Sequence, residues 1–377
     1  MRRSLLSLRA RGWHVALSLD LMRVSVPRSE AGKLQSIGAM RCALGRRAEA
    51  AAREHIVHIG YHKTASTWLQ VCVFPYCAGV RYGDPLCNDF VTNLATAPER
   101  AFFAEGFRRV LRQIESQSSG PLLLSNEGLS GSLWDGDEIG LRNAARLHRV
   151  IPAGRIMIVV RRQDEMLRSI HAQYVNEGGT RPLREFVGRS VEGSRFSLRH
   201  LEYDRLIGRY VELFGRDRVW VVPYEHLRAG RERFLDALCA FLGAELTAEV
   251  SRAWPNHSLS RPSLWLLRSW NRLFRVTRFN RAPGLAALPG GKYVRNLMQE
   301  RVDPVVRRLL NTKDSVMDSR WLADLAAGFA ESNSRLQRFC AQPLATWGYP
   351  LLPATTWTGA RPDSALLDPG RSGFRHG

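Results

Sequence analysis

The sequence predicts an α/β fold of three layers, in which a central parallel β-sheet is flanked by helices. Four short apolar runs have the length and composition of strands that are buried on both faces. Segments of helical length separate these runs, and parallel strands need crossover connections of that kind. The four runs are HIVHI at 55–59, PLLLS at 121–125, RIMIVV at 155–160 and VWVVPY at 219–224.

Two helices are indicated by apolar residues that recur at helical spacing. One stripe covers residues 203–214 and is followed by Gly215, and another covers residues 234–242 and is followed by Gly243. Glycine directly after such a stripe often ends a helix, because it adopts the left-handed conformation without strain. We interpret both stripes as sides of helices that face the core, rather than as contacts to a cofactor.

A third segment, residues 263–280, mixes apolar residues with arginines and predicts a basic amphipathic helix. Two interpretations stay open, because such a helix either covers the sheet or lies on a membrane surface as a peripheral contact. Residues 281–293 are rich in proline and glycine and predict a loop. No run of 18 or more apolar residues occurs, so we expect no transmembrane helix of normal length.

Composition divides the chain into three parts. Residues 1–53 form an Arg-rich extension in which we expect little packed structure, residues 54–350 form the folded domain, and residues 351–377 form a flexible tail. The extension lacks the long uncharged stretch of a signal peptide. Its charge resembles that of an organelle transit peptide, and a further alternative is that translation begins at Met40.

The charge and the cysteine content limit which partners and which cellular compartment are expected. The net charge is +20, but only four of the 55 basic residues are lysines, a bias that GC-rich coding DNA also produces. Nucleic acid is therefore not the favoured partner, although a basic surface attracts anionic ligands. The six cysteines form no CxxC pair and no metal-like group with histidine, which is typical of reduced thiols and favours a cytoplasmic location.

The segment GYHKTASTW, residues 60–68, is the most informative part of the sequence. A glycine after a strand lets the chain turn sharply, and the helix that follows presents unpaired N–H groups and a positive dipole to an anion. A lysine in so arginine-rich a chain indicates that a compact point charge is needed here. The side chains expected to face a phosphate are Lys63, Thr64, Ser66 and Thr67.

This loop differs from the usual loop that binds nucleoside triphosphates, GxxxxGK[ST]. Lys63 follows Gly60 by only three positions, and no second glycine precedes the lysine. The next apolar run, PLLLS, is followed by Asn126 and Glu127 rather than by an aspartate suited to magnesium. A phosphate ligand that binds without a metal therefore fits this sequence better than ATP with magnesium.

Residues 60–70, GYHKTASTWLQ, resemble the first signature of the sulfotransferases that use 3′-phosphoadenosine 5′-phosphosulfate (PAPS). In that family a strand leads into a loop of the type GxxKTGTTxLQ, which binds the 5′-phosphosulfate. Ala65 stands at the place of the usual glycine, and Ser66 at the place of a threonine. Both departures are mild.

A second signature of the family also has a counterpart. It consists of an arginine after a central strand and a helical serine eight residues on, which together hold the 3′-phosphate. Arg161 and Ser169 have this spacing after RIMIVV. Arg162 and Gln163 replace the usual Asp-Pro or Asn-Pro, which leaves open which of the two arginines binds the phosphate.

The resemblance covers about residues 55–350, whose later segments are similar to those of bacterial sulfotransferase-domain proteins. It implies a P-loop-like fold, PAPS as the donor and no bound metal. It also implies that Lys63 stabilises the leaving oxygen and that Glu127 is the catalytic base, with His62 as the second candidate for that base. We interpret His58, on the first strand, as a core residue with satisfied hydrogen bonds. The residues implied to bind the cofactor are Gly60, Lys63, Thr64, Ala65, Ser66, Thr67, Trp68, Arg161 and Ser169.

The expected acceptor is a glycan or a small molecule that carries a hydroxyl or an amine. The phosphate loop and the segment Ser125–Glu127 resemble those of carbohydrate sulfotransferases more than those of enzymes that act on phenols. Two alternatives remain: a P-loop kinase that uses ATP with magnesium on a small molecule, and a non-catalytic protein that binds polyanions through its basic surface. The oligomeric state stays open.

Overall fold

A computed structural model describes residues 54–353 except residues 118–119, 135, 137, 189–195, 252–258, 282–283, 286–290 and 311–315. All described residues belong to one compact unit. The predicted Arg-rich extension, the alternative start at Met40, nearly all of the predicted tail and most of the predicted loop at 281–293 lie outside the described residues. The domain boundaries therefore stay predictions.

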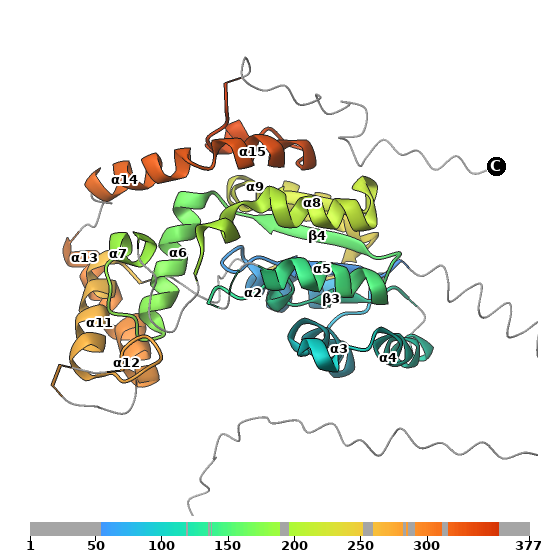
Figure 1. The fold of residues 1–377 in the computed structure, drawn as a ribbon, viewed down its shortest axis with the longest axis horizontal. Helices are drawn as coiled ribbons and strands as arrows, with labels where there is room; N and C mark the ends of the chain where they lie inside the picture. The colour runs from blue at the N-terminus through green and yellow to red at the C-terminus, as the bar shows by residue number, and fades with distance from the viewer. Residues whose placement is uncertain are drawn as a thin grey trace, which may run out of the picture. The chain divides into compact units, whose positions relative to one another are not determined.

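The centre of the fold is a sheet of four parallel strands (Figure 1). They are β1 (Ile56–Gly60), β3 (Leu123–Ser125), β4 (Arg155–Val160) and β5 (Val219–Pro223), in the spatial order β3-β1-β4-β5. Residue Ile56 pairs with Leu123 on one side and with Arg155 on the other. The predicted α/β class is confirmed, and each strand overlaps the apolar run from which it was predicted.

The sheet separates two hydrophobic cores, because successive side chains of a strand point to opposite faces. Val57 and Ile59 belong to one core, which contains residues of α3, α4, α5 and α8. Ile56 belongs to the other core, together with Met157 and residues of the helical segment after β1 and of α10. This arrangement confirms the three layers.

The helices have the following bounds: α2 (Ser66–Trp68), η2 (Leu69–Val73), η3 (Phe74–Tyr76), α3 (Pro85–Thr96), η4 (Glu99–Ala101), α4 (Ala104–Ser116), η5 (Glu127–Ser130), α5 (Glu138–Val150), α6 (Gln163–Asn176), α7 (Leu183–Gly188), η6 (Leu198–Leu201), α8 (Tyr203–Phe214), η7 (Arg216–Arg218), α9 (Tyr224–Ala229), α10 (Arg231–Leu242), α11 (Arg261–Phe274), α12 (Gly291–Leu297), η8 (Met298–Val302), α13 (Asp303–Leu310), α14 (Val316–Ala327), α15 (Ala330–Leu336), η9 (Gln337–Phe339) and η10 (Leu344–Trp347). A small antiparallel pair joins β2 (Cys77–Ala78) and β6 (Glu245–Leu246).

The two helices predicted from apolar stripes are confirmed as α8 and α10. No helix among the described residues has the length and hydrophobicity to cross a membrane.

The basic amphipathic helix is shorter than predicted, because α11 ends at Phe274 rather than at residue 280. Residues Thr277 and Asn280 close a tight turn through mutual backbone hydrogen bonds of 2.8 and 3.2 Å. The side-chain amide of Asn280 donates to the carbonyls of Asn271 and Arg275 at the helix end. On its inner side α11 contacts α6, where the Asn271 amide donates to the carbonyl of Val175 at 2.7 Å. The described part of the predicted loop also differs, because α12 already begins at Gly291.

The N-terminal end of α6 is held by the C-terminal part of the chain. The buried amide of Gln163 donates to the side-chain oxygen of Asn333 at 2.6 Å, and the Asn333 amide donates to the carbonyl of Pro350 at 3.1 Å. Nearby, the carboxylate of Glu225 accepts hydrogen bonds from the Arg162 N–H and from the Tyr349 hydroxyl. Buried polar groups that satisfy one another in this way fix the position of the helix that follows β4.

We expect Asn333→Leu to lower the free energy of unfolding by about 2–4 kcal/mol, because the change removes three side-chain hydrogen bonds and leaves the buried Gln163 amide with only the weaker contact to the Leu201 carbonyl among the described residues. Urea unfolding monitored by circular dichroism measures the effect. The same substitution at Asn88, which is exposed on α3, is the control. Equal stability of the two variants would show that the network contributes nothing.

Candidate active site

The loop between β1 and α2 has an unusual backbone. Lys63 and Ala65 both adopt the left-handed conformation, with φ of 67°. Left-handed residues in a turn aim successive N–H groups into a concavity that suits an anion. For residues other than glycine this conformation costs about 1–2 kcal/mol each. The loop is therefore strained, and strain of this kind is concentrated at functional sites.

Gly60 is required for space rather than for an unusual φ. A Cβ atom on Gly60 would lie 2.4 Å from Ser66 Oγ and 3.2 Å from Glu127 Cγ. Gly60 itself is not among the residues with positive φ. The sharp turn that was predicted at this glycine is made three and five residues later, and the glycine instead allows Ser66 and Glu127 to approach the end of β1.

We expect Ala65→Gly to raise the stability of the protein slightly. Glycine removes strain of about 1–2 kcal/mol at this position and gives back about 0.4–1 kcal/mol in unfolded-state entropy, so a net gain below about 1.5 kcal/mol is expected. Chemical unfolding measures the change. Ala78→Gly, on an exposed strand position without positive φ, is the control and should destabilise. Destabilisation by both changes to the same extent would contradict the strain at Ala65.

A cavity of about 600 Å³, here called the loop cavity, lies at the carboxyl ends of β1 and β4. Residues from the phosphate loop, η5 and α6 line it, with Tyr224 and Arg295. The predicted site residues on its wall are His62, Lys63, Ala65, Ser66, Thr67, Trp68, Glu127, Arg161 and Ser169. Gly60 and Thr64 do not line the cavity. The buried Thr64 hydroxyl instead donates to the Tyr61 carbonyl at 2.6 Å and braces the loop.

Lys63 lines this cavity, and its ammonium group donates a hydrogen bond of 2.6 Å to the side-chain oxygen of Gln173 on α6. Burial lowers the pKa of Lys63 from its ordinary value; the charge of Glu127 opposes this shift, and that of Arg295 adds to it. A partly buried cation whose one hydrogen-bond partner among the described residues is neutral is a site at which an anion gains electrostatic stabilisation. Sequence reasoning did not find Gln173, because its role depends on how α6 lies against the loop.

His62 and Glu127 form a pair at the other side of the cavity. The imidazole Nδ1 lies 3.1 Å from Glu127 Oε2, and Nε2 lies 3.1 Å from the carbonyl oxygen of Gly131. A carbonyl oxygen and an ionised carboxylate can only accept, so each contact is a hydrogen bond when the ring nitrogen that faces it carries the hydrogen. Both ring nitrogens of His62 are engaged by these acceptors, which favours Glu127 over His62 as the base.

The pKa of Glu127 is set by opposing effects. Burial raises it, but the hydrogen bond to His62 and the positive charges of His62 and Lys63 outweigh burial, so that the pKa lies below its ordinary value of 4.5. The carboxylate is therefore ionised at neutral pH. This is the protonation state that a group must have to accept a proton.

The structure distinguishes the two arginines after β4. Arg161 donates to the Lys63 carbonyl at 3.1 Å and to Glu165 at 2.9 Å, and its guanidinium lies 4.8 Å from the centre of the Tyr224 ring. Its buried Nε–H has no acceptor among the described residues. Arg162 instead pairs with Asp164 through bonds of 2.6 and 2.9 Å and does not line the loop cavity. Arg161 is therefore the arginine that faces the site.

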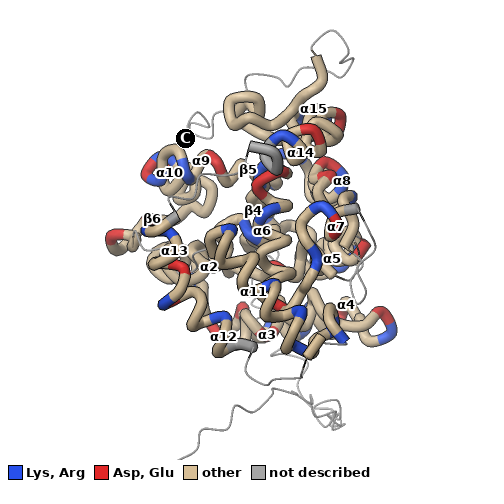
Figure 2. Tube along the Cα trace, turned by 90° about the vertical axis from the view of Figure 1, so that its left-hand side faces the viewer, with Lys and Arg blue, Asp and Glu red and all other residues tan. Residues whose placement is uncertain are grey.

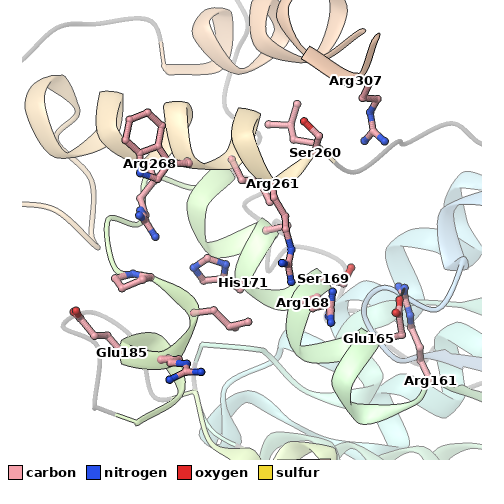
Figure 3. Close-up of a pocket in the computed structure, with 17 residues that line it drawn as sticks. Arg161, Glu165, Arg168, Ser169, His171, Glu185, Ser260, Arg261, Arg268 and Arg307 are labelled. Carbon is pink, nitrogen blue, oxygen red and sulfur yellow. Dashed lines mark hydrogen bonds and ion pairs between the residues drawn. The ribbon is translucent and has the colours of Figure 1, made fainter. Parts of the chain in front are cut away.

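A second cavity of about 680 Å³, here called the arginine cavity, adjoins the first (Figure 3). The two share Arg161, Ser169 and Ala172. Figure 3 shows Arg161 beside Glu165, with Arg168 and Ser169 further along the same helix and Arg261 and Arg268 on α11 across the cavity. Sequence reasoning missed this cavity, although two of its arginines lie in the amphipathic helix. It extends the positive surface beyond the residues of the second signature.

Trp68 and His58 belong to the core. The Trp68 side chain is 1% exposed and packs in the second hydrophobic core, and its N–H donates to the Ser251 carbonyl, so that only its edge borders the loop cavity. His58 Nδ1 lies 2.8 Å from Ser125 Oγ, and burial lowers the pKa of His58 to about 4. The expectation of a core histidine is confirmed, but its Nε2 has no partner among the described residues.

The model of a family described as the sulfotransferase family matches residues 84–248. The match covers less than half of the chain. That family consists of enzymes that use PAPS. The matched segment contains Glu127, Arg161 and Ser169 but begins after the phosphate loop. The likeness of residues 60–70 to the first signature is therefore a separate observation from the family match.

Two solved structures are also similar. A sulfotransferase from Alicyclobacillus acidocaldarius is 18% identical, with a TM-score of 0.40, over 58% of this chain and 94% of that one. The sulfotransferase domain from the curacin biosynthetic pathway is 11% identical, with a TM-score of 0.35, over 72% of this chain and 97% of that one. No curated protein matches the chain.

Proposed function

We propose that this protein is a PAPS-dependent sulfotransferase that moves a sulfuryl group to a hydroxyl or an amine of an acceptor by in-line transfer. The observation that carries the proposal is the loop cavity, in which the strained loop with Lys63 faces Arg161 and Ser169. The family match over residues 84–248 supports it independently, because that segment does not include the loop.

The groups around the loop cavity fit the donor PAPS. Its two phosphate positions need cations and neutral hydrogen-bond donors, and the cavity offers an ammonium, a guanidinium and hydroxyl groups. The buried Nε–H of Arg161 without a described acceptor is a further donor available to an anion. Ser66 and Thr67, at the start of α2, add hydroxyls beside the helix N-terminus. Tyr224 offers an aromatic face next to Arg161.

PAPS supplies the sulfuryl group, whose bond to the 5′-phosphate oxygen breaks while a bond to the acceptor forms. Lys63 holds the positive charge that neutralises the leaving oxygen, as cationic groups do in phosphoryl transfer. Arg161 and Ser169 orient the nucleotide through its 3′-phosphate. Glu127 accepts the acceptor's proton, and His62 keeps that carboxylate ionised and in place.

For the acceptor we propose a carbohydrate hydroxyl. This preference rests on the likeness of the phosphate loop and of Ser125–Glu127 to carbohydrate sulfotransferases. The proposed cytoplasmic location rests on the cysteine pattern, and the described cysteines are all free thiols. Neither proposal is needed for the donor assignment.

Calorimetric titration of the wild type and of Lys63→Ala with 3′-phosphoadenosine 5′-phosphate, AMP and ATP with magnesium tests the donor assignment. We expect selective binding of the bisphosphate that weakens in the variant. A preference for ATP with magnesium would favour the kinase. Salt-sensitive binding to heparin that Lys63→Ala does not change, without nucleotide binding, would favour the non-catalytic alternative.

We expect Arg161→Ala to weaken binding of 3′-phosphoadenosine 5′-phosphate by about tenfold to a hundredfold and to leave AMP binding nearly unchanged. The reason is that a lost charge-assisted hydrogen bond costs about 1.5–3 kcal/mol, and AMP lacks the 3′-phosphate that we assign to Arg161 on the cavity wall. Calorimetry with both nucleotides measures the difference. Arg162→Ala is the matched control, because Arg162 pairs with Asp164 outside the cavity wall. Equal losses in the two variants would remove the assignment to Arg161.

A further inference from the structure

Helices α11, α12 and α13 lie together at one end of the protein (Figure 1). These helices and the described residues 275–281 and 284–285 expose large apolar side chains. We call this surface the α11–α13 face. Helix α11 contacts α13 and η8, and α12 continues directly into η8, so the elements form one structure. The exposed fractions reach 57% for Trp265, 71% for Leu285, 73% for Tyr293 and 76% for Leu309. Side chains of this size are normally covered when several lie near one another.

The exposure follows from the helical spacing. On α11, Leu267 and Asn271 are buried against the rest of the protein, whereas Trp265, Arg272 and Leu273 lie on the opposite side of the helix. The chain then returns to this outer side, because the N–H of Leu285 donates to the Leu273 carbonyl at 3.0 Å. Leu273 and Leu285 are therefore neighbours, and both are exposed.

The same segment is strongly basic. Residues 261–310 contain eleven Lys and Arg but only two Asp and Glu, so they carry nearly half of the chain's net charge of +20. One of the two acids, Asp303, is buried and bonded to the Ser260 N–H and to Arg307. Arg272, Arg301 and Arg308 are exposed, and no described carboxylate pairs with any of them. Figure 2 looks onto this end of the protein and shows basic residues on α11 and α13.

We propose that the α11–α13 face docks the protein on the surface of a lipid bilayer that contains anionic lipids. At the boundary between lipid headgroups and acyl chains, apolar side chains are buried among the acyl chains while neighbouring arginines contact the anionic headgroups. Tryptophan and tyrosine prefer that boundary, and Trp265 and Tyr293 are in this position. A purely polyanionic partner would match the arginines but would leave the apolar side chains in water, so charge and exposure together favour the bilayer.

The face borders both cavities. Trp265 also lines the arginine cavity, and Arg295 on α12 lines the loop cavity. Docking therefore brings the mouth of the site to the membrane surface, where a lipid-linked acceptor would meet it. This last consequence rests on the proposed function, whereas the docking itself does not.

Co-sedimentation of the full chain with vesicles tests the proposal. One vesicle preparation contains phosphatidylcholine alone. The other contains phosphatidylcholine with about 30% phosphatidylglycerol, which gives the vesicle a negative surface charge. We expect at least about tenfold tighter binding to the anionic vesicles. The paired change Arg272→Gln with Arg308→Gln should weaken it by about 25-fold, since each basic residue near the surface contributes about fivefold. The paired change Tyr293→Ser with Leu309→Ser should also weaken binding to the anionic vesicles, and this loss should persist at moderate salt concentration.

The matched control is Arg109→Gln with Val110→Ser, which changes an exposed arginine and an exposed apolar residue on α4. This variant should bind the vesicles like the wild type. Titration with 3′-phosphoadenosine 5′-phosphate, together with circular dichroism, shows whether each variant keeps its fold and nucleotide site, so that failure of docking and failure of the proposed function can be told apart.

Three outcomes would overturn the proposal. The first is absence of binding to anionic vesicles. The second is binding that the control loses as strongly as the two α11–α13 variants. The third is self-association in sedimentation velocity that the change at Tyr293 and Leu309 abolishes, which would make a second copy of the chain the occupant of the face.

Discussion

Replacing Lys63 with alanine is expected to lower turnover of PAPS by at least about a hundredfold while the fold stays intact. The ammonium group is partly buried at the cavity wall, where its charge is less screened than in water, and removal of one such stabilising donor costs about 10²–10³ in rate in comparable sites. Release of 3′-phosphoadenosine 5′-phosphate from PAPS, with simple sugars and alcohols as acceptors, measures the effect.

Lys63→Arg is the informative companion to this change. It keeps the charge but replaces a compact ammonium with a planar group that the Gln173 contact does not fit, so partial activity is expected. Turnover in Lys63→Ala within threefold of the wild type would show that Lys63 is only a loop residue. A large loss of thermal stability in the alanine variant would indicate a structural role instead, and calorimetry with the bisphosphate separates the two.

The second large effect is expected for Glu127→Gln, which should reduce transfer by about a hundredfold and leave nucleotide affinity nearly unchanged. Glutamine keeps the size of the side chain and can still contact His62, but it cannot accept the acceptor's proton. Steady-state transfer rates and bisphosphate titrations on the same preparation measure both quantities. A parallel loss of nucleotide affinity would show that Glu127 acts in binding rather than in proton transfer.

The pH dependence provides an independent check on this carboxylate. The pKa of Glu127 in the folded protein lies below its ordinary value of 4.5, so the ionised form is stabilised by folding. That contribution is present above the unfolded pKa and is lost as the pH falls through the lower folded value. We therefore expect no loss of transfer from this group until the pH falls below about 4.5. A loss of rate near neutral pH that disappears in His62→Asn would identify His62 as the base.

The sheet was predictable because its strands are buried on both faces and therefore appear as unbroken apolar runs. The end of α11 was not predictable in the same way, because the stop depends on the Asn280 side chain, which folds back onto the carbonyls of Asn271 and Arg275. Helical periodicity contains no information on such a contact. The helix expected after the phosphate loop is present but not regular, because α2 is short and passes into the π-helix η2 at Leu69–Val73.

The candidate site was predictable where local spacing determines it. The spacing of Arg161 and Ser169 and the sequence of the phosphate loop were enough to predict residues that the structure places around one cavity. The contacts of Lys63 with Gln173 and of Arg161 with Tyr224 were not predictable, because each joins positions more than sixty residues apart. Sequence alone also left open which of two adjacent arginines faces the cavity, and the difference lies in the partner that each guanidinium finds.

The hydrogen bonds of Asn333 and Tyr349 to the start of α6 and to Glu225 have a consequence for biosynthesis. All four strands of the sheet precede residue 230 in the chain, so they are synthesised early and the sheet can assemble before the C-terminal part is made. The buried Gln163 and Glu225 find these partners only after the chain has been made to about residue 350. The start of α6, which carries Gln163, therefore gains its last hydrogen bonds only near the end of synthesis.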